Sequence, residues 1–102
     1  MRMMMKVTFS IEAGNEAIRD PQFGAKIKAL MSELKPEAAY FTTVDGQRGG
    51  YIFLNIDDAS QIPAIAEPFF LWMDADVEFT PVMVPADLEK AGPAIAAAVK
   101  KW

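Results

Sequence analysis

The stretch FFLWMDADVEF at residues 69–79 decides the fold, because a helical pattern changes to a strand pattern inside it. Four large apolar side chains in a row, FFLW, close a helix that we expect over residues 59–73. Apolar and polar residues then alternate, which predicts a strand over residues 75–84 with one apolar face. Pro81 cannot donate to a ladder hydrogen bond, so this strand is expected at an edge of its sheet.

The same two periods recur towards the N-terminus. Residues 3–12, MMMKVTFSIE, alternate between apolar and polar side chains and predict a strand that ends at Gly14 and Asn15. A helical stripe follows, for which Asp20 is the expected N-cap and Pro36 the stop. The chain is therefore expected to begin with a strand and a helix.

Between the two predicted helices lies an expected β-hairpin. Residues 38–45 and 50–56 are rich in aromatic and β-branched residues, which favour strands. The sequence GQRG separates them, and we expect a loop longer than a two-residue turn.

The chain closes with a further helix, expected over residues 86–101. Pro85 suits its start, and Gly92-Pro93 should bend or interrupt it. Its apolar stripe consists of Leu88, Ile95, Val99 and Trp102.

The order of these elements predicts the fold class. Two right-handed β-α-β units place both connecting helices on one face of a four-stranded antiparallel sheet, with the first and third strands at its centre. This is the ferredoxin-like arrangement of the α+β class, here with an extra C-terminal helix, and we expect a single domain over residues 1–102. Phe69 belongs to the core stripe of its helix, whereas Phe70 and Trp72 lie on its flanks. Trp72 is expected at an interface or cavity rim, and the alternative is a plain core position.

The sheet face away from the helices raises the question of a partner. Its expected side chains are too apolar for a wet face and too polar for a dry core: Lys6, Thr8, Ser10, Glu12, Tyr40, Thr42, Tyr51, Phe53, Asn55, Glu78, Thr80 and Val82. Each aromatic ring of this face that stays in water loses stabilisation on the order of a kcal/mol that burial would give. We therefore expect a homodimer joined through these faces, with Phe53, Phe70 and Trp72 at the interface.

With this element order, and with FFLWMDADVEFTPVMV near its end, the chain resembles the dimeric α+β barrel proteins over residues 3–84. In that superfamily two ferredoxin-like subunits pack sheet to sheet and enclose a small, partly polar cavity. Its members include muconolactone isomerases, cofactorless monooxygenases of antibiotic biosynthesis and stress-responsive barrel proteins. The resemblance implies a homodimer with a cavity on the sheet face. Some members use a catalytic or haem-ligating His, and this sequence contains no His. The resemblance therefore implies no catalytic residue and no cofactor.

Polar residues of that face are candidate ligand contacts. Lys6, Glu12 and Glu78 could form a charge group in which a desolvated carboxylate acts as a base; the alternative is a salt bridge between strands. The hairpin tyrosines and Asn55 could orient a ligand, or could satisfy one another across the interface. The complete set expected around the cavity is Lys6, Thr8, Ser10, Glu12, Tyr40, Thr42, Tyr51, Asn55 and Glu78.

Arg48, in GQRGG, could hold an anion from a mobile loop, or could be solvated at a hairpin tip. The glycines around it form no phosphate loop, because the segment joins two strands and opens no helix. Five aspartates are weak candidates for metal ligands: Asp57, Asp58, Asp74, Asp76 and Asp87. The DD and DAD segments lie at expected capping and turn positions, and no calcium-loop spacing occurs. We therefore expect no metal site.

Composition narrows the functions further. A net charge of −4 with scattered basic residues argues against a nucleic-acid partner. The absence of Cys excludes disulfides, and the absence of His removes the side chain best suited to proton transfer near neutral pH. The apolar run in MRMMMK is too short for a secretory signal, and residues 62–73 are too few and too interrupted to span a bilayer. The expected location is the cytoplasm.

Two classes of function remain. The first is a dimer that binds a small organic molecule in a cavity on the sheet face, which the polar lining favours. The second is an interaction module whose sheet face serves only assembly, which the lack of His and Cys favours on chemical grounds. A cofactorless enzyme of the monooxygenase or isomerase type is a further alternative.

Overall fold

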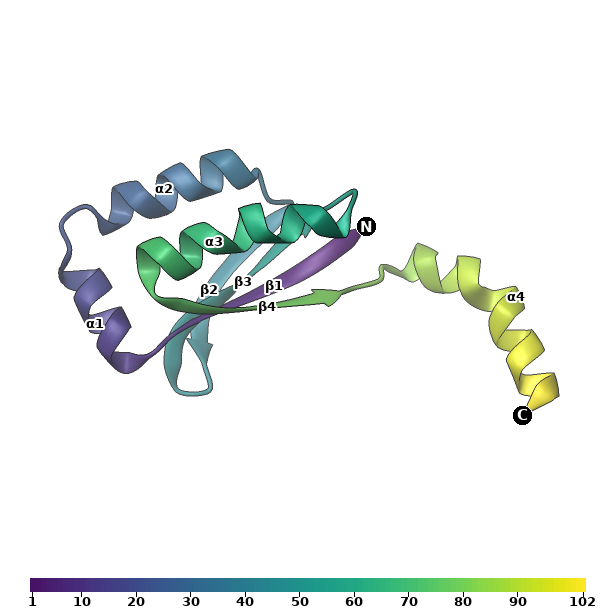
Figure 1. Cartoon of the computed structure of the whole chain (residues 1–102). Helices are drawn as coiled ribbons and strands as arrows, with labels where there is room; N and C mark the ends of the chain where they lie inside the picture. Colours follow the sequence, from purple (N-terminus) through teal and green to yellow (C-terminus); the bar gives the residue numbers. More distant parts are fainter.

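Four strands form one antiparallel sheet in the computed structural model, which describes all 102 residues (Figure 1). In the sheet order β2-β3-β1-β4, the strands are β1 (Arg2–Phe9), β2 (Ala38–Val44), β3 (Gln47–Asn55) and β4 (Ala75–Pro81). The helices are α1 (Ile11–Arg19), α2 (Phe23–Leu34), the short 3-10 turn η1 (Ala59–Gln61), α3 (Ile62–Met73) and α4 (Pro85–Lys101). The α+β ferredoxin-like fold is confirmed, with the first and third strands at the centre and the Pro81 strand at an edge.

The core lies between the sheet and the helices α2 and α3. Met5 is fully buried at the middle of β1, opposite Ile52 of β3 and Phe79 of β4. Leu30 of α2 and Phe69 of α3 complete the layer, and the Phe69 side chain is only 2 % exposed. The core position predicted for Phe69 is therefore confirmed.

Helix α1 is an element that we did not expect. β1 ends at Phe9, and the Oγ of Ser10 accepts a backbone N–H of the next turn at 3.1 Å. A serine N-cap with Glu12 in the first turn stabilises a helix start, and this local signal overrides the continuing alternation. The strand expected over residues 3–12 is wrong in its last part, and Ser10 and Glu12 leave the sheet.

The start of α2 differs from expectation by one turn. Asp20 does not cap the helix directly; it accepts the N–H of Gln22 at 2.9 Å and pairs with Lys26 Nζ at 2.8 Å. The helix ends as predicted, because Lys35 adopts a left-handed conformation just before Pro36. Asp20 thus orients the turn between α1 and α2.

The hairpin between β2 and β3 is tighter than expected. Asp45 and Gly46 form the whole connection, with positive φ values of 53° and 79°, as a type I′ turn requires. Gly49 and Gly50 lie inside β3, where a Cβ would come within 2.4 Å and 2.5 Å of carbonyl oxygens in the neighbouring strands. The longer loop expected over GQRG is therefore wrong.

The two proline-containing helices are both continuous. α3 runs through Pro68 and α4 runs through Pro93, so the expected interruption at Gly92-Pro93 does not split α4. β4 ends at Pro81, three residues earlier than expected. The chain then leaves the sheet, and α4 projects away from it, which gives the molecule a longest dimension of 58 Å (Figure 1). No residue of α4 is buried, and the helix covers neither face of the sheet.

Candidate functional site

The sheet face opposite α2 and α3 is uncovered, and strand pairing arranges its side chains in rows. One row crosses all four strands at the same level and consists of Glu78, Lys6, Tyr51 and Tyr40. Because residues that are directly opposite in a sheet lie on the same face, these four side chains are neighbours. The candidate residues Lys6, Tyr40, Tyr51 and Glu78 are thus brought together.

Two further rows flank the first one. On one side, Thr8 of β1 lies level with Asp76 of β4, and Gly49 separates it from Thr42 of β2. On the other side, Met4 lies opposite Phe53, whose ring packs edge-to-face on Tyr40 with centroids 6.3 Å apart. The open face therefore has a polar end and an aromatic end.

Lys6 lies close to two carboxylates on this face. Its Nζ lies 3.2 Å from Oε2 of Glu78 and 3.9 Å from Oδ2 of Asp45. The hydrogen bond to Glu78, together with the negative charge of that carboxylate, raises the pKa of Lys6 above its ordinary value. Lys6 therefore stays protonated near neutral pH, and its ammonium group is suited to binding rather than to acting as a base.

A shallow hollow of about 400 Å³ lies around Lys6, and we call it the polar hollow. It is lined by Lys6, Thr8, Asp45, Gln47, Phe70, Asp76, Val77 and Glu78. Three carboxylates face one ammonium group, so the local charge is negative. A neutral or cationic polar molecule fits this surface better than an acid does.

The other candidate residues lie elsewhere. Ser10 caps α1 and Glu12 lies exposed in its first turn, so the expected charge group of Lys6, Glu12 and Glu78 loses one member. Asn55 is exposed at the end of β3 opposite Arg2. Trp72 is half exposed, and its ring faces α2, where Lys26 Nζ lies 5.5 Å from the ring centroid.

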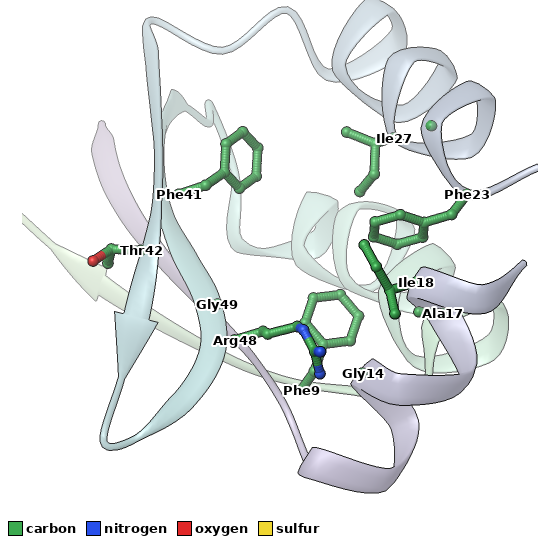
Figure 2. A pocket seen from close by; sticks show the side chains of 11 residues that line it. Phe9, Gly14, Ala17, Ile18, Phe23, Ile27, Phe41, Thr42, Arg48 and Gly49 are labelled. Atoms are coloured by element: carbon green, nitrogen blue, oxygen red, sulfur yellow. The ribbon is translucent and has the colours of Figure 1, made fainter.

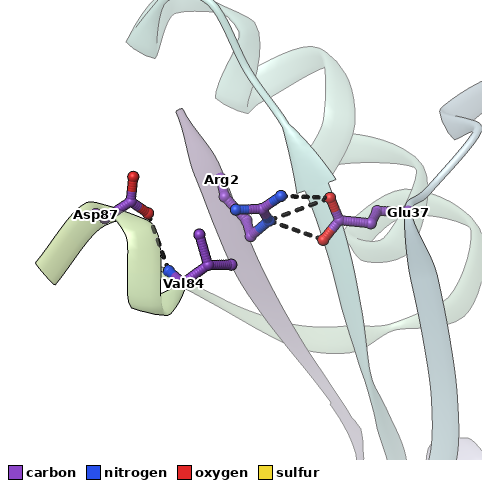
Figure 3. A network of polar contacts seen from close by, with 4 residues as sticks. All are labelled: Arg2, Glu37, Val84 and Asp87. Carbon is purple, nitrogen blue, oxygen red and sulfur yellow. Dashed lines mark hydrogen bonds and ion pairs between the residues drawn. The ribbon is translucent and has the colours of Figure 1, made fainter. Parts of the chain in front are cut away.

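An ion pair joins the first residue of β1, Arg2, to Glu37, the residue just before β2 (Figure 3). Arg2 donates from Nε and Nη2 to the carboxylate of Glu37 at 2.8 Å and 2.9 Å. This contact raises the pKa of Arg2 and lowers the pKa of Glu37. In the same view, the N–H of Val84 donates to Asp87 at 2.9 Å in the first turn of α4. The pair links residues that lie 35 positions apart in the sequence at one end of the sheet.

A second cavity lies on the opposite side of the sheet, between α1, α2 and the hairpin, and we call it the helix-side pocket (Figure 2). Its volume is about 440 Å³. Sequence reasoning missed it, because it depends on α1, which was not predicted. Two signals pointed to it: the glycines at positions 14 and 24 within helical segments, and Arg48 among the glycines of the hairpin.

No three acidic side chains come together in a way that could hold a metal ion. No helix combines the length and the apolar character that crossing a bilayer requires. The chain matches no protein family model and no curated protein. Its function therefore has to be argued from its own surfaces.

Proposed function

We propose that the chain forms a homodimer through its open sheet face, as a dimeric α+β barrel that binds a small organic molecule in the polar hollow. The observation that carries the proposal is the exposed aromatic surface of that face. Tyr40 is 63 % exposed, and Tyr51 and Phe53 on the neighbouring strand keep part of their surface exposed. Large apolar surfaces of this kind on a folded chain mark interaction sites.

The size of the available surface fits a second copy. Four strands of this length, at the usual spacing and rise, give the face a projected area on the order of 400 Å². A helix as long as α4 adds on the order of 250 Å² when it lies on a partner. Together these areas approach the ~800 Å² that each partner buries in a standard interface.

α4 offers a second surface that a partner subunit can cover. The apolar stripe of α4 is exposed along its length, with Ile95 52 % exposed. A single helix of this length with Gly92-Pro93 at its middle is marginal in water, so it gains stability by packing on another copy.

Pairing of two open faces encloses the polar hollow. Lys6 remains an ammonium ion, because Glu78 raises its pKa, and the surrounding carboxylates favour a ligand that donates hydrogen bonds. A small amine or polyhydroxylated molecule has this chemistry. The raised pKa of Lys6 also favours binding over catalysis by a lysine base.

Phe53→Asp tests the proposal, because it places a carboxylate without a partner at the centre of the paired faces. Wild-type protein at micromolar concentration should sediment with twice the chain mass, and the variant should sediment as a monomer. Small amines should raise the melting temperature of the wild type by binding the native dimer, and should leave that of the variant unchanged.

The matched control is Leu71→Asp, since Leu71 is 80 % exposed on α3, on the side of the molecule away from the open face. This variant should remain a dimer. A monomeric wild type would overturn the proposal, and so would a Phe53→Asp variant that still dimerises.

A further inference from the structure

The helix-side pocket has apolar walls from four different elements (Figure 2). Phe9 of β1, Ile18 of α1, Phe23 and Ile27 of α2, and Phe41 of β2 all line it. Phe41 is 63 % exposed and Ile18 is 59 % exposed, although both point into the space between the elements. A concave surface with this much apolar lining and a volume of about 440 Å³ has the dimensions of a small-molecule site.

Two glycines keep this pocket open. Gly14 lies in α1, and a Cβ there would come within 2.9 Å of Nη1 of Arg48. Gly24 lies in the first turn of α2, where a Cβ would meet nothing within 4 Å. Glycine weakens a helix interior by about 1 kcal/mol relative to alanine. At position 14 it makes room for the arginine, and at position 24 it leaves part of the wall empty.

Arg48 is the one charged residue of this lining. It stands on β3, and its side chain extends towards Gly14 of α1 (Figure 2). Its Nη1 donates to Oδ1 of Asn15 in the same helix at 3.0 Å. The four ion pairs of the molecule use Arg2, Lys6 and Lys26, so Arg48 has no carboxylate partner. Its Nε and Nη2 donate to no protein atom.

An unpaired guanidinium beside apolar walls selects a particular ligand chemistry. The planar fork of an arginine matches the two oxygens of a carboxylate, and such charge-assisted hydrogen bonds are stronger than neutral ones. The rest of the lining presents mainly apolar atoms, with the Thr42 hydroxyl as its one other polar side-chain group. We propose that the helix-side pocket binds a small monocarboxylic acid with an aromatic or compact aliphatic body, whose carboxylate pairs with Arg48.

The site is independent of the proposed dimer, because it lies on the other side of the sheet. 1-Naphthoate and the matched neutral 1-naphthylmethanol serve as probes, with binding followed by amide shifts of the full-length chain and by calorimetry. Naphthoate should shift the amides of Gly14, Gly24 and Phe41, and it should bind roughly tenfold to a hundredfold more tightly than the alcohol. The comparison between the two probes needs no variant.

Arg48→Gln should lower the affinity for naphthoate by roughly tenfold to a hundredfold and leave the affinity for the alcohol unchanged. Arg19→Gln is the control, because Arg19 lies exposed in the last turn of the same helix that Arg48 reaches, outside the lining. It should change neither affinity. Gly24→Leu should abolish binding of both probes by filling the open wall.

Three results would overturn the proposal. The first is a shift pattern confined to the open sheet face or to α4. The second is an equal loss of affinity for 1-naphthoate and for 1-naphthylmethanol in Arg48→Gln. The third is an affinity for naphthoate that falls as the protein concentration rises, since that would mean that a second copy occupies the helix-side pocket.

Discussion

α3 and α4 each have a proline in the first turn, a second proline inside and an apolar stripe, yet only α3 buries its stripe. Ala66, Phe69 and Met73 of α3 are buried against the sheet. Leu88, Ile95 and Val99 of α4 are all more than half exposed. The two helices therefore have similar sequence patterns, and they differ in whether the sheet lies against the apolar stripe.

The connections explain this difference. α3 is followed directly by β4, and a strand that must pair with β1 holds the helix on the sheet face. No strand follows α4, so no sheet pairing brings it back. Between β4 and α4, the backbone hydrogen bond that reaches the sheet is that of the Val82 N–H, which donates to the carbonyl of Arg2 at 3.1 Å. An apolar stripe marks the face that a helix can bury, whereas topology decides whether a partner is within reach.

Matched truncations should separate the two helices most clearly. Phe69→Ala should lower the free energy of unfolding by about 3–5 kcal/mol, because it leaves a cavity in the core. Ile95→Ala should leave the unfolding midpoint of dilute protein unchanged, since Ile95 is exposed and lies outside the core. Urea denaturation at low protein concentration measures both. A comparable loss from the two variants would mean that α4 packs on its own subunit.

Glycine replacements should sharpen the same comparison at a smaller scale. Gly24→Ala should stabilise the protein by about 0.5–1 kcal/mol, because an added Cβ meets open space in a helix that is coupled to the core. Gly92 in α4 also faces open space. Gly92→Ala should raise the helical signal in circular dichroism without moving the unfolding midpoint. A shift of that midpoint in dilute protein would contradict the independence of α4.

The smallest effect concerns acid. The pKa of Glu37 is lowered because Arg2 donates to it, and that of Asp20 is lowered by Lys26. A lowered pKa in the folded state adds stability that is fully present above the unfolded pKa, about 4, and lost as the pH falls through the folded pKa. In Glu37→Gln, the free energy of unfolding should fall less steeply as the pH is lowered, and denaturation at a series of pH values measures this. Glu89→Gln, on an exposed α4 position without an ion pair, should leave the profile unchanged.

Much of the fold could be predicted from local patterns. The alternation in β1 and the stripe through Phe69 depend on residues close in the chain, and the order of strands and helices then restricts the topology. α1 was missed because Ile11 continues the alternation of β1, and the Ser10 cap outweighed it. The hairpin was misjudged because Gly49 and Gly50 looked like loop residues, although they are strand residues in close contact with neighbouring backbone.

The candidate site was predictable only in part. The register of antiparallel strands is enough to align Lys6, Tyr51 and Glu78, so their neighbourhood followed from the strand assignments. Glu12 was expected at the site because the first strand was predicted to run to residue 12, whereas β1 ends at Phe9. The helix-side pocket could not be predicted, because its walls meet only when α1 turns the chain away from the sheet.

The tight hairpin has a consequence for recognising relatives of this chain. Its turn requires positive φ at Asp45 and Gly46, and the backbone of neighbouring strands leaves no space for a Cβ at Gly49 and Gly50. Substitution at the two strand glycines demands movement of a whole strand, whereas most other positions of the hairpin accept different side chains. The spacing Asp-Gly-x-x-Gly-Gly is therefore a signature dictated by stereochemistry, and distant homologues that retain this hairpin should keep it after the rest of their sequence has diverged.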